Sequence, residues 1–470
     1  MHQGLCSSYI RVKSMRTPVR RPMRKTRVLV ALAASCLCFI VFHICISSTT
    51  RILNRAEFSA ETPEITRDIL AISKQSHHPS KEIPIICDRT SKHYDLCSIN
   101  SPTVLDPTTS TFFIMSSTQL PSMATIRPYP RKFEDFIMSR IKDFTLTVGP
   151  RIPLCKVQHN APALVFAAGG YTGNFWHDFN DGFIPLFITI NTLLPDQDFV
   201  IVASDAPKLW VSKYADLLHI FTKHPIITLG NVTTTHCFPS AKLGLITHGF
   251  MTINQTLIPN SKTFLHFREL LDNAYNRRSQ ARLLLSQLKK PRPRLVLASR
   301  SHATGRRIMN QAQVVRLIKK VGFDVVVFEP KANTSLHESY ALLNSSHALV
   351  GIHGAALTHS LFLRPGSVFV QVVPIGVDWV AKACFGTVAK GLDLEYFEYK
   401  IGVEESSLVD KYGNDSLVVK DPSGLQKMGW RAEVMDIYLK EQNVKLDLVM
   451  FKGYLKQAYK KAKKFMENNG

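Results

Sequence analysis

The sequence predicts an α/β protein with two domains, each built around a mainly parallel β-sheet. Apolar runs of strand length alternate with longer segments of helical periodicity, first between residues 85 and 258 and again between 259 and 445. The length of 470 residues and the hydrophobic content of 45% provide enough material for two cores and exclude a disordered chain. We expect the two domains to face each other across a cleft.

The first domain is expected to contain three buried strands separated by two helices. The strands are ALVFAAG at 163–169, DFVIVASD at 198–205 and PIITL at 225–229. Helical length and spacing identify the segments between them, 174–194 and 209–221. A long amphipathic stretch at 262–288 then ends at KKPRPR, whose prolines mark a boundary.

The second domain repeats this alternation as a βαβαβ unit. Strands are expected at 294–300, 323–330, 348–353 and 367–374, with helices at 309–322, at 336–346 and after the turn that follows residue 353. Units of this kind bind nucleotides at the carboxyl ends of their strands. A helix at 446–470 follows, and we expect its lysines to form a solvated face.

Charge at the amino end predicts a membrane orientation. The formal net charge is +22, and eight of the 58 basic residues lie before residue 28, whereas the first acidic residue is Glu57. Residues 28–46 carry no formal charge, and a helix of this length, at ~1.5 Å per residue, spans one hydrocarbon core. The positive-inside rule then puts residues 1–27 in the cytosol and the rest in the lumen, with 47–84 as a stem. A cleaved signal peptide is the alternative.

Sequons and cysteines agree with a lumenal, oxidising compartment, which argues against a nucleic-acid partner. Five N-glycosylation sequons follow the apolar segment, at Asn231, Asn254, Asn333, Asn344 and Asn414. Five cysteines also follow it, so at most two disulfides form. We expect Cys87 to pair with Cys97 and Cys155 with Cys237, leaving Cys384 as a buried free thiol. No cysteine has zinc-ligand spacing, and we expect no metal site.

Two loops at strand ends in the second domain are candidate anion-binding sites. In SRSHATGRR, a strand is followed by Arg300, Arg306 and Arg307, whose guanidinium groups match phosphate oxygens. In GIHGAALTH, His353 ends a strand, while Gly354 and Ala355 let backbone N–H groups approach an anion at a helix amino terminus. The alternatives are a solvated basic loop for the first segment and close packing of small residues for the second.

A third cluster lies in the first domain, in GGYTGNFWHDFND at 169–181. His177 and Asp181 are four residues apart and share one face of the expected helix. A carboxylate that orients an imidazole suits the deprotonation of a hydroxyl group. Asp178 points elsewhere, as a charge at the start of the helix. A capped, hydrogen-bonded helix start is the alternative for the whole cluster.

Three longer segments extend these motifs: GGYTGNFWHDFNDGFIPLFIT, SRSHATGRRI and VGIHGAALTHSLFLRPGSVFVQVVP. Together with the basic, anchored amino terminus they resemble plant glycosyltransferase family 61, and within it the grass clade of xylan-decorating enzymes. The resemblance covers residues 85–450. It implies a GT-B-type fold with two Rossmann-like domains, in a single-pass type II protein of the Golgi membrane whose catalytic part is lumenal. It also implies inverting transfer from a UDP-sugar with no required cofactor, and a divalent cation is not indicated.

In this clade the implied donor is UDP-xylose or UDP-arabinofuranose, and the implied acceptor is xylan. The resemblance implies Arg300, Arg307 and the segment 353–355 for the nucleotide-sugar, and His177 with Asp181 for the acceptor side. We therefore expect a β-1,2-xylosyltransferase of cell-wall xylan synthesis, acting beside other xylan synthesis proteins. The alternatives are an α-1,3-arabinofuranosyltransferase and a non-catalytic, carbohydrate-binding member of a Golgi complex.

Overall fold

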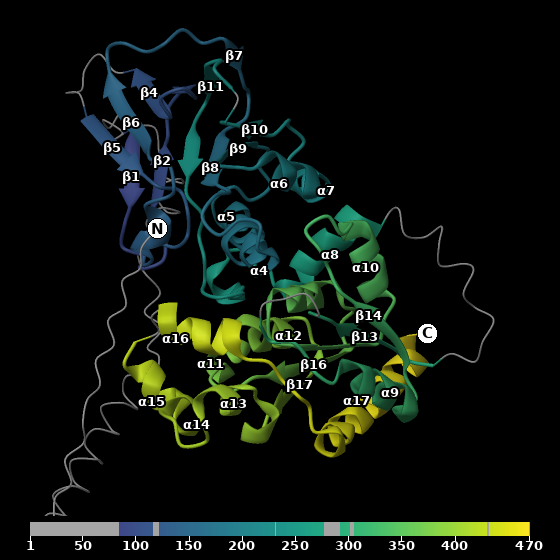
Figure 1. Ribbon diagram of the computed structural model, residues 1–470. Helices are drawn as coiled ribbons and strands as arrows, with labels where there is room; N and C mark the ends of the chain where they lie inside the picture. Colours follow the sequence, from purple (N-terminus) through teal and green to yellow (C-terminus); the bar gives the residue numbers. More distant parts are fainter. Residues whose placement is uncertain are drawn as a thin grey trace, which may run out of the picture. The chain divides into compact units, whose positions relative to one another are not determined.

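Three β-sheets organise the part of the chain that the structure describes (Figure 1). The structure is a computed structural model and describes residues 84–115, 122–230, 232–276, 292–300, 305–429 and 432–469. The expected anchor at 28–46, the stem and the sequon at Asn231 lie outside these ranges. Within them, no helix is both long and apolar enough to cross a bilayer.

The first sheet contains the three strands expected in the first domain. Its strands are β1 (Ile85–Asp88), β2 (Leu96–Ile99), β8 (Ala163–Ala167), β9 (Val200–Ser204), β10 (Ile227–Thr228) and β12 (Ala241–Leu243). They lie in the order β1-β2-β12-β8-β9-β10, in which the last four are parallel and the first two form an antiparallel edge. Because both faces of the central strands are buried, those strands are continuous apolar runs.

The helices of the first sheet differ from the expected ones in two places. The segment 174–194 is helical throughout but contains a π-helix, as α4 (Phe175–His177), η1 (Asp178–Phe183) and α5 (Ile184–Leu193). The single helix expected at 209–221 is two, α6 (Lys208–Lys213) and α7 (Ala215–Phe221). The break falls at Tyr214, whose φ of −105° and ψ of 12° are not helical.

A second, mixed sheet was not expected from the sequence. Its strands are β3 (Thr103–Asp106), β4 (Thr111–Met115), β5 (Ser122–Ile126), β6 (Phe144–Gly149), β7 (Val157–Gln158) and β11 (His236–Phe238), in the order β5-β6-β4-β3-β11-β7. It packs on the first sheet through a shared core that includes Phe112, Leu146 and Val202. The expectation of one mainly parallel sheet in this part of the chain is therefore incomplete.

The third sheet is parallel throughout, as expected for a βαβαβ unit. Its strands are β13 (Arg294–Ala298), β14 (Asp324–Phe328), β15 (Ala348–Ile352), β16 (Val368–Val373) and β17 (Glu395–Lys400), in the order β14-β13-β15-β16-β17. The chain moves outward in one direction from β13 to β14 and in the other from β15 to β17. Ligands of such sheets bind where this direction reverses, outside the carboxyl ends of β13 and β15.

Helices cover both faces of the third sheet. One face packs on α9 (Gln311–Val321) and on α17 (Leu448–Asn469), whose buried side chains include Phe451, Leu455 and Ala458. The lysines at 456, 460, 461, 463 and 464 lie on the exposed side of α17, as expected. The other face packs on α8 (Phe264–Tyr275), α10 (Leu336–Asn344), the 3-10 helix η5 (Ala355–Phe362) and α12 (Thr387–Gly391).

The remaining helical segments are short and lie around these layers. They are α3 (Asp135–Met138), η2 (Gln255–Leu257), α11 (Asp378–Ala381), η6 (Lys382–Gly386), η7 (Val403–Glu405), α13 (Leu408–Tyr412), α14 (Leu417–Lys420), α15 (Pro422–Lys427), α16 (Ala432–Asp436) and η8 (Ile437–Glu441).

One hydrophobic core joins the first sheet to the third. It contains Phe179 and Phe183 of η1 together with Leu357 and Leu361 of η5. The ring of Phe175 in α4 also stacks on His359 of η5, with centroids 4.3 Å apart. The segment that carries His177 and Asp181 is thus held against the helix that follows β15.

Both expected disulfides are present, and Cys384 is a buried free thiol. Cys87 and Cys97 face each other across the β1–β2 pair. Cys155 joins Cys237 of β11 across 82 residues of sequence and links the segment before β7 to the second sheet. Of the sequons in the described residues, Asn254, Asn333 and Asn414 are exposed, whereas Asn344 is half-buried and accepts a hydrogen bond from Arg268.

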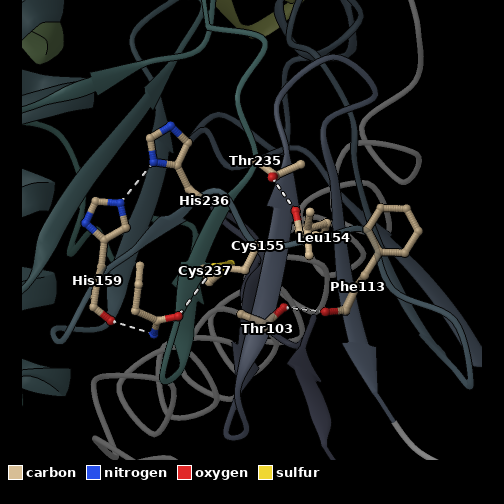
Figure 2. Close-up of a disulfide and its surroundings, with 9 residues drawn as sticks. Thr103, Phe113, Leu154, Cys155, His159, Thr235, His236 and Cys237 are labelled. Atoms are coloured by element: carbon tan, nitrogen blue, oxygen red, sulfur yellow. Dashed lines mark hydrogen bonds between the residues drawn. A yellow bond between two sulfur atoms is a disulfide. The ribbon is translucent and has the colours of Figure 1, made fainter.

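A pair of histidines lies beside the second disulfide (Figure 2). His159 Nε2 and His236 Nδ1 are 2.9 Å apart, so one proton is shared between two ring nitrogens. Burial lowers the pKa of both rings, and the charge of His236 lowers the pKa of His159 further. Burial likewise lowers the pKa of His248, His347 and His359 to about 4.

Because the pKa values of these histidines are lowered in the folded protein, we expect the protein to be less stable in mild acid. Below pH 6.5 the unfolded chain takes up protons that the folded chain cannot, so the free energy of unfolding falls as the pH drops from 6.5 towards 4. For His347 alone, a folded pKa of about 4 makes this loss about 1–2 kcal/mol between pH 7 and pH 5. His347→Asn keeps an acceptor for the Arg294 N–H that His347 Nδ1 now binds, and should lose correspondingly less.

Urea unfolding at a series of pH values measures this effect. The control is His219→Asn, since His219 is exposed in α7. A wild-type stability that stays constant or rises from pH 6.5 to pH 4.5 would contradict the prediction.

Candidate active site

The first part of the site is the imidazole–carboxylate pair of His177 and Asp181. The side chain of Asn174 caps α4 by accepting a hydrogen bond from the Trp176 N–H at 3.1 Å. The π-helical turn that follows brings His177 Nδ1 to 2.8 Å from Asp181 Oδ2. The two side chains that were expected to share a helix face therefore form a hydrogen-bonded pair.

A network of buried donors keeps Asp181 ionised. Arg131 Nε donates to Oδ1 at 2.8 Å, and the Tyr129 hydroxyl donates to Oδ2 at 2.9 Å. Burial by itself raises the pKa of Asp181, but the hydrogen bond from His177 and the charge of Arg131 outweigh it and lower that pKa below its ordinary value. The carboxylate is consequently a fixed negative charge under the imidazole.

This charge decides which nitrogen of His177 carries the proton. Nδ1 lies 2.8 Å from the carboxylate and 3.3 Å from Arg131 Nη2, and the shorter contact is with an anion, so Nδ1 donates to Asp181. The lone pair is then on Nε2, which has no hydrogen-bond partner in the described part of the chain. The side chain of His177 is 18% exposed, and the Tyr171 ring stacks on it at 4.2 Å. Such an imidazole can accept a proton from a bound hydroxyl group.

Asp178 points away from this pair, as expected. Its carboxylate accepts from the Tyr214 hydroxyl at 2.7 Å and from the Gly173 N–H at 3.1 Å. Burial raises its pKa against these hydrogen bonds. Asp178 therefore fixes the 169–174 loop on the helices rather than taking part in the pair.

The second part of the site lies where the strand order of the third sheet reverses. Arg300 follows β13 and His353 follows β15, and these strands are neighbours in the sheet. A Cβ atom at Gly354 would lie 2.5 Å from Arg300 Nη1 and 3.2 Å from Arg306 Nη1, so both guanidinium groups lie against the backbone of this turn. Only glycine leaves room for them.

The two arginines form a positive cluster without a carboxylate partner among the described residues. Arg306 donates to the carbonyl groups of His353 and Leu439, at 2.9 and 2.8 Å. Burial, followed by the charge of Arg300, lowers the pKa of Arg306 to about 9. Burial also lowers the pKa of Arg300. Positive charge that is buried and not neutralised by the protein favours a bound anion.

Arg307 differs from its two neighbours. Its backbone N–H donates to Asn443 Oδ1 at 3.0 Å, and its carbonyl accepts from the Val444 N–H at 2.8 Å. Its guanidinium makes no hydrogen bond or ion pair with the cluster in the described part of the chain. The structure thus brings together Arg300, Arg306, His353 and Gly354, with Ala355 next in the turn, while a role for Arg307 stays a prediction.

His353, in the same turn, is a neutral imidazole. Its Nδ1 is 2.8 Å from Gln371 Nε2, and the Tyr396 hydroxyl donates to the other end of this amide. Because Nδ1 accepts from Gln371, the ring proton is on Nε2. Burial, together with the charges of Arg306 and Arg300, keeps the pKa of His353 well below its ordinary value, so the ring stays neutral.

A cavity of about 400 Å³ opens at this turn. The segments that follow β13 and β15 contribute Arg300, Ala355 and Ala356 to its wall, while Asn174 at the cap of α4 and Lys213 of α6 contribute from the other side. Charges of both parts of the site act on the buried thiol of Cys384. Burial raises the pKa of this thiol to about 12, whereas the charges of Arg131 and Arg306 act to lower that pKa. The imidazole–carboxylate pair and the arginine cluster therefore lie within electrostatic range of one buried side chain.

Sequence reasoning missed several residues of the site. They are Tyr129, Arg131, Tyr171, Lys213, Gln371 and Tyr396. The composition of PYPRKFEDF offers no signal that Arg131 binds a carboxylate 50 residues later. Gln371, in contrast, is a buried polar residue within the apolar strand SVFVQVVP, and such a residue signals a hydrogen-bond partner. In the described residues, no three His, Cys, Asp or Glu side chains come together as a metal site.

Comparison with known proteins gives these residues a family. The family model Glycosyltransferase 61 matches residues 173–370. The xylan glycosyltransferase MUCI21 of Arabidopsis thaliana is 39% identical over 405 residues, which cover 81% of this chain and 80% of that protein.

Two rice proteins are also similar. The alpha-1,3-arabinosyltransferase XAT3 and the beta-1,2-xylosyltransferase XYXT1, both of Oryza sativa subsp. japonica, are 32% and 33% identical to this chain. The matches cover 79% and 71% of this chain, and 64% and 71% of those proteins. Among solved structures, the bacterial glycosyltransferase TibC from enterotoxigenic E. coli has a TM-score of 0.25 at 12% identity, and the match covers 64% of this chain and 80% of that chain.

The match to the family model contains both parts of the site, from the 173–181 segment to the turn at 353–355. The similarity to the Arabidopsis protein extends over about four fifths of each chain. The chain therefore belongs to glycosyltransferase family 61.

Proposed function

We propose that this protein is an inverting glycosyltransferase of the GT-B type that transfers a pentose, with xylose favoured, from a UDP-sugar to the xylan backbone. The observation that carries the proposal is that a hydrogen-bonded imidazole–carboxylate pair and a buried arginine cluster occur in one compact unit. The family supports the reaction class. The names of the relatives, which refer to xylan, xylosyl transfer and arabinosyl transfer, support the donor and acceptor.

The proposed reaction is a single displacement. An acceptor hydroxyl gives its proton to His177 Nε2 while its oxygen attacks the anomeric carbon of the donor sugar. The bond from that carbon to the diphosphate breaks, and UDP departs with the bonding electron pair. Asp181 stabilises the imidazolium that forms, since it is already ionised and in contact with Nδ1. Attack from the side opposite the leaving group inverts the anomeric carbon.

The arginine cluster is proposed to stabilise the departing diphosphate. Arg300 and Arg306 supply positive charge, and the Nε2–H group of neutral His353 supplies a hydrogen bond. Since this charge comes from the protein itself, we propose that the reaction needs no resident metal ion. Transfer that is abolished by EDTA and restored by Mn²⁺ would contradict this part of the proposal.

A panel of donors and acceptors tests the function. The full-length protein is incubated with UDP-xylose or UDP-arabinofuranose and with xylo-oligosaccharides, and the linkage and anomeric configuration of the product are determined by NMR. We expect a β-1,2-linked xylosyl product. An α-1,3-arabinofuranosyl product would establish the alternative donor. A protein that binds xylan but neither transfers a sugar nor gains thermal stability from UDP would be a non-catalytic member of a complex.

We further propose that the protein is a single-pass type II protein of the Golgi membrane, anchored by residues 28–46 and working beside other xylan synthesis proteins. The charge pattern of the amino end and the exposed sequons at Asn254, Asn333 and Asn414 support this topology. In sealed microsomes the region after the anchor should be protected from protease, and endoglycosidase should reduce its apparent mass. A nuclear, unglycosylated protein would overturn the proposal.

Gly354→Ala is expected to lower kcat/KM for the donor at least tenfold. The new methyl group would lie 2.5 Å from Arg300 Nη1, so the guanidinium must move away from the proposed diphosphate site, and small misplacements of this kind reduce rates steeply. The control is Gly453→Ala, since a Cβ at Gly453 meets no atom within 4 Å. Equal donor kinetics in the two variants would contradict the placement of the diphosphate.

A further inference from the structure

Five aromatic rings lie one after another from the protein surface to the imidazole of His177. Successive ring centroids are 5.3 Å apart from His93 to Phe133, 6.5 Å from Phe133 to Phe250, 6.0 Å from Phe250 to Trp176, and 4.8 Å from Trp176 to His177. We call the first four rings the aromatic strip. Its outer end is open, because His93 is exposed and Phe133 is 48% exposed, whereas Phe250 and Trp176 are half-buried.

The strip is assembled from four separate segments of the chain. His93 lies in the turn between β1 and β2, Phe133 lies just before α3, Trp176 is in α4, and Phe250 is in the loop after β12. A backbone hydrogen bond of 3.0 Å from the Lys132 N–H to the His93 carbonyl holds the first two segments together. Of the four rings, Trp176 packs against a hydrophobic core of the described residues, whereas Phe133 and Phe250 belong to none. Aromatic side chains that converge on the surface from distant parts of the sequence in this way indicate a binding site.

Arg131 connects the strip to the catalytic pair. Its guanidinium carbon lies 5.9, 5.7 and 5.1 Å from the ring centroids of Phe133, Trp176 and Phe250, while its Nε atom binds Asp181. The charge that helps to keep Asp181 ionised therefore also holds the three rings through cation–π contacts. The position of the strip is fixed relative to His177 by the same side chain.

We infer that the aromatic strip is the acceptor subsite, on which a linear chain of β-linked pentose units lies with its reactive hydroxyl at His177 Nε2. This inference rests on the proposed function. The C–H groups of a pyranose ring form an apolar face, and the negative face of an aromatic ring attracts these groups. Within the strip, successive ring centroids are 5.3–6.5 Å apart and the rings are inclined to one another by 54–89°, so successive sugars would meet ring edges as well as ring faces. Xylan suits such a strip because its backbone is unbranched where it has not yet been decorated.

The nucleotide is a weaker candidate for this surface. The cavity at Arg300, Ala355 and Ala356 lies at the reversal of strand order in the third sheet, whereas no ring of the strip lines that cavity. The two aromatic rings that do line it, Phe175 and His359, already stack on each other. The strip and the donor cavity therefore share no residue, although both adjoin α4.

The test compares two phenylalanines of one segment in the full-length protein. Phe133 belongs to the strip, and Phe136 is 67% exposed but lies outside it, against Arg140. Calorimetric titration with xylohexaose in the presence of UDP should show a Kd at least tenfold higher for Phe133→Ala and for Phe250→Ala, and no change for Phe136→Ala. Phe133→Trp should retain the affinity of the wild type. The affinity for xylobiose should change less, because a short acceptor does not reach Phe133.

Several outcomes would overturn the inference. One is an unchanged Kd for xylohexaose in both strip variants, and another is an equal loss in Phe136→Ala. A third is a loss of UDP affinity as large as the loss of xylohexaose affinity, which would make the strip a nucleotide platform. Failure of the wild type to bind xylohexaose would also overturn it.

Sugar transfer by the same proteins separates this inference from the proposed function. If Phe133→Ala transfers sugar to xylohexaose as well as the wild type does, the proposed function holds and the inference about the strip is wrong. If the protein consumes no UDP-sugar but binds xylohexaose in a way that depends on Phe133, the inference about the strip holds and the proposed function is wrong.

Discussion

His177→Ala should reduce kcat for sugar transfer by about 10²–10⁴-fold while leaving the affinity for UDP unchanged. In the described residues, His177 is the only histidine whose Nδ1 is held by a buried carboxylate while its Nε2 has no hydrogen-bond partner. Its loss removes the acceptor of the hydroxyl proton but none of the contacts to the donor. Steady-state kinetics with saturating acceptor measure kcat, and thermal stabilisation by UDP reports on the donor site.

The choice of His177 rather than Asp181 keeps the fold intact. Asp181 is buried and paired with Arg131 at 2.8 Å, so Asp181→Asn would leave the buried guanidinium with Glu134 as its remaining counter-charge, at a cost of up to about 3–5 kcal/mol. His177→Gln is a second, milder variant that retains a hydrogen-bond donor to Asp181. His219→Ala, on the exposed side of α7, is the control. If His177→Ala retains more than a tenth of wild-type kcat, another group must be the base.

Arg300→Ala should reduce kcat/KM for the donor by about 10²–10³-fold, which is the usual effect of removing one group that stabilises developing negative charge. Arg300 follows β13 at the reversal of strand order, and its Nε atom is buried without a hydrogen-bond partner among the described residues. An anion with several oxygens would satisfy that group, and the diphosphate of the proposed donor is such an anion. Initial rates at varied donor concentration and the affinity for UDP both measure the loss.

Two further variants make this prediction specific. Arg300→Lys keeps the charge but not the planar group, and should recover only part of the activity. Arg292→Ala removes an exposed arginine just before the same strand, at its opposite end, and should have little effect. Equal UDP affinity in Arg300→Ala and the wild type would show that the diphosphate binds elsewhere.

Contacts between residues that are close in the sequence could be predicted, whereas contacts between distant residues could not. His177 and Asp181 are four residues apart, so their pairing depends on one turn of helix and could be predicted. Arg300 and His353 both follow strands of a βαβ unit, whose local connections determine which strands are neighbours. The prediction of the third sheet was confirmed for the same reason, because local connections determine its strand order.

Long-range pairing could not be predicted from local patterns. In the second sheet β3 pairs with β11, so Val104 lies opposite Cys237, and several of its strands have only two to four residues. Such strands depend on their partners for stability, and their own sequences are weak signals. Arg131 was missed in the same way, since its partners are 46 and 50 residues later in the chain.

The π-helical turn η1 also restricts how this protein can change during evolution. A π-helical turn holds one residue more than an α-helical turn, and each residue of an α-helix turns the chain by about 100°. Deletion of one residue near Gly182 would restore regular winding and would rotate His177 and Asp181 together relative to α5. Arg131 comes from another segment and would not follow them. The length of this segment is therefore as important for the site as the identity of its residues. Among active descendants of this protein, an insertion or deletion in the segment should be rarer than a substitution.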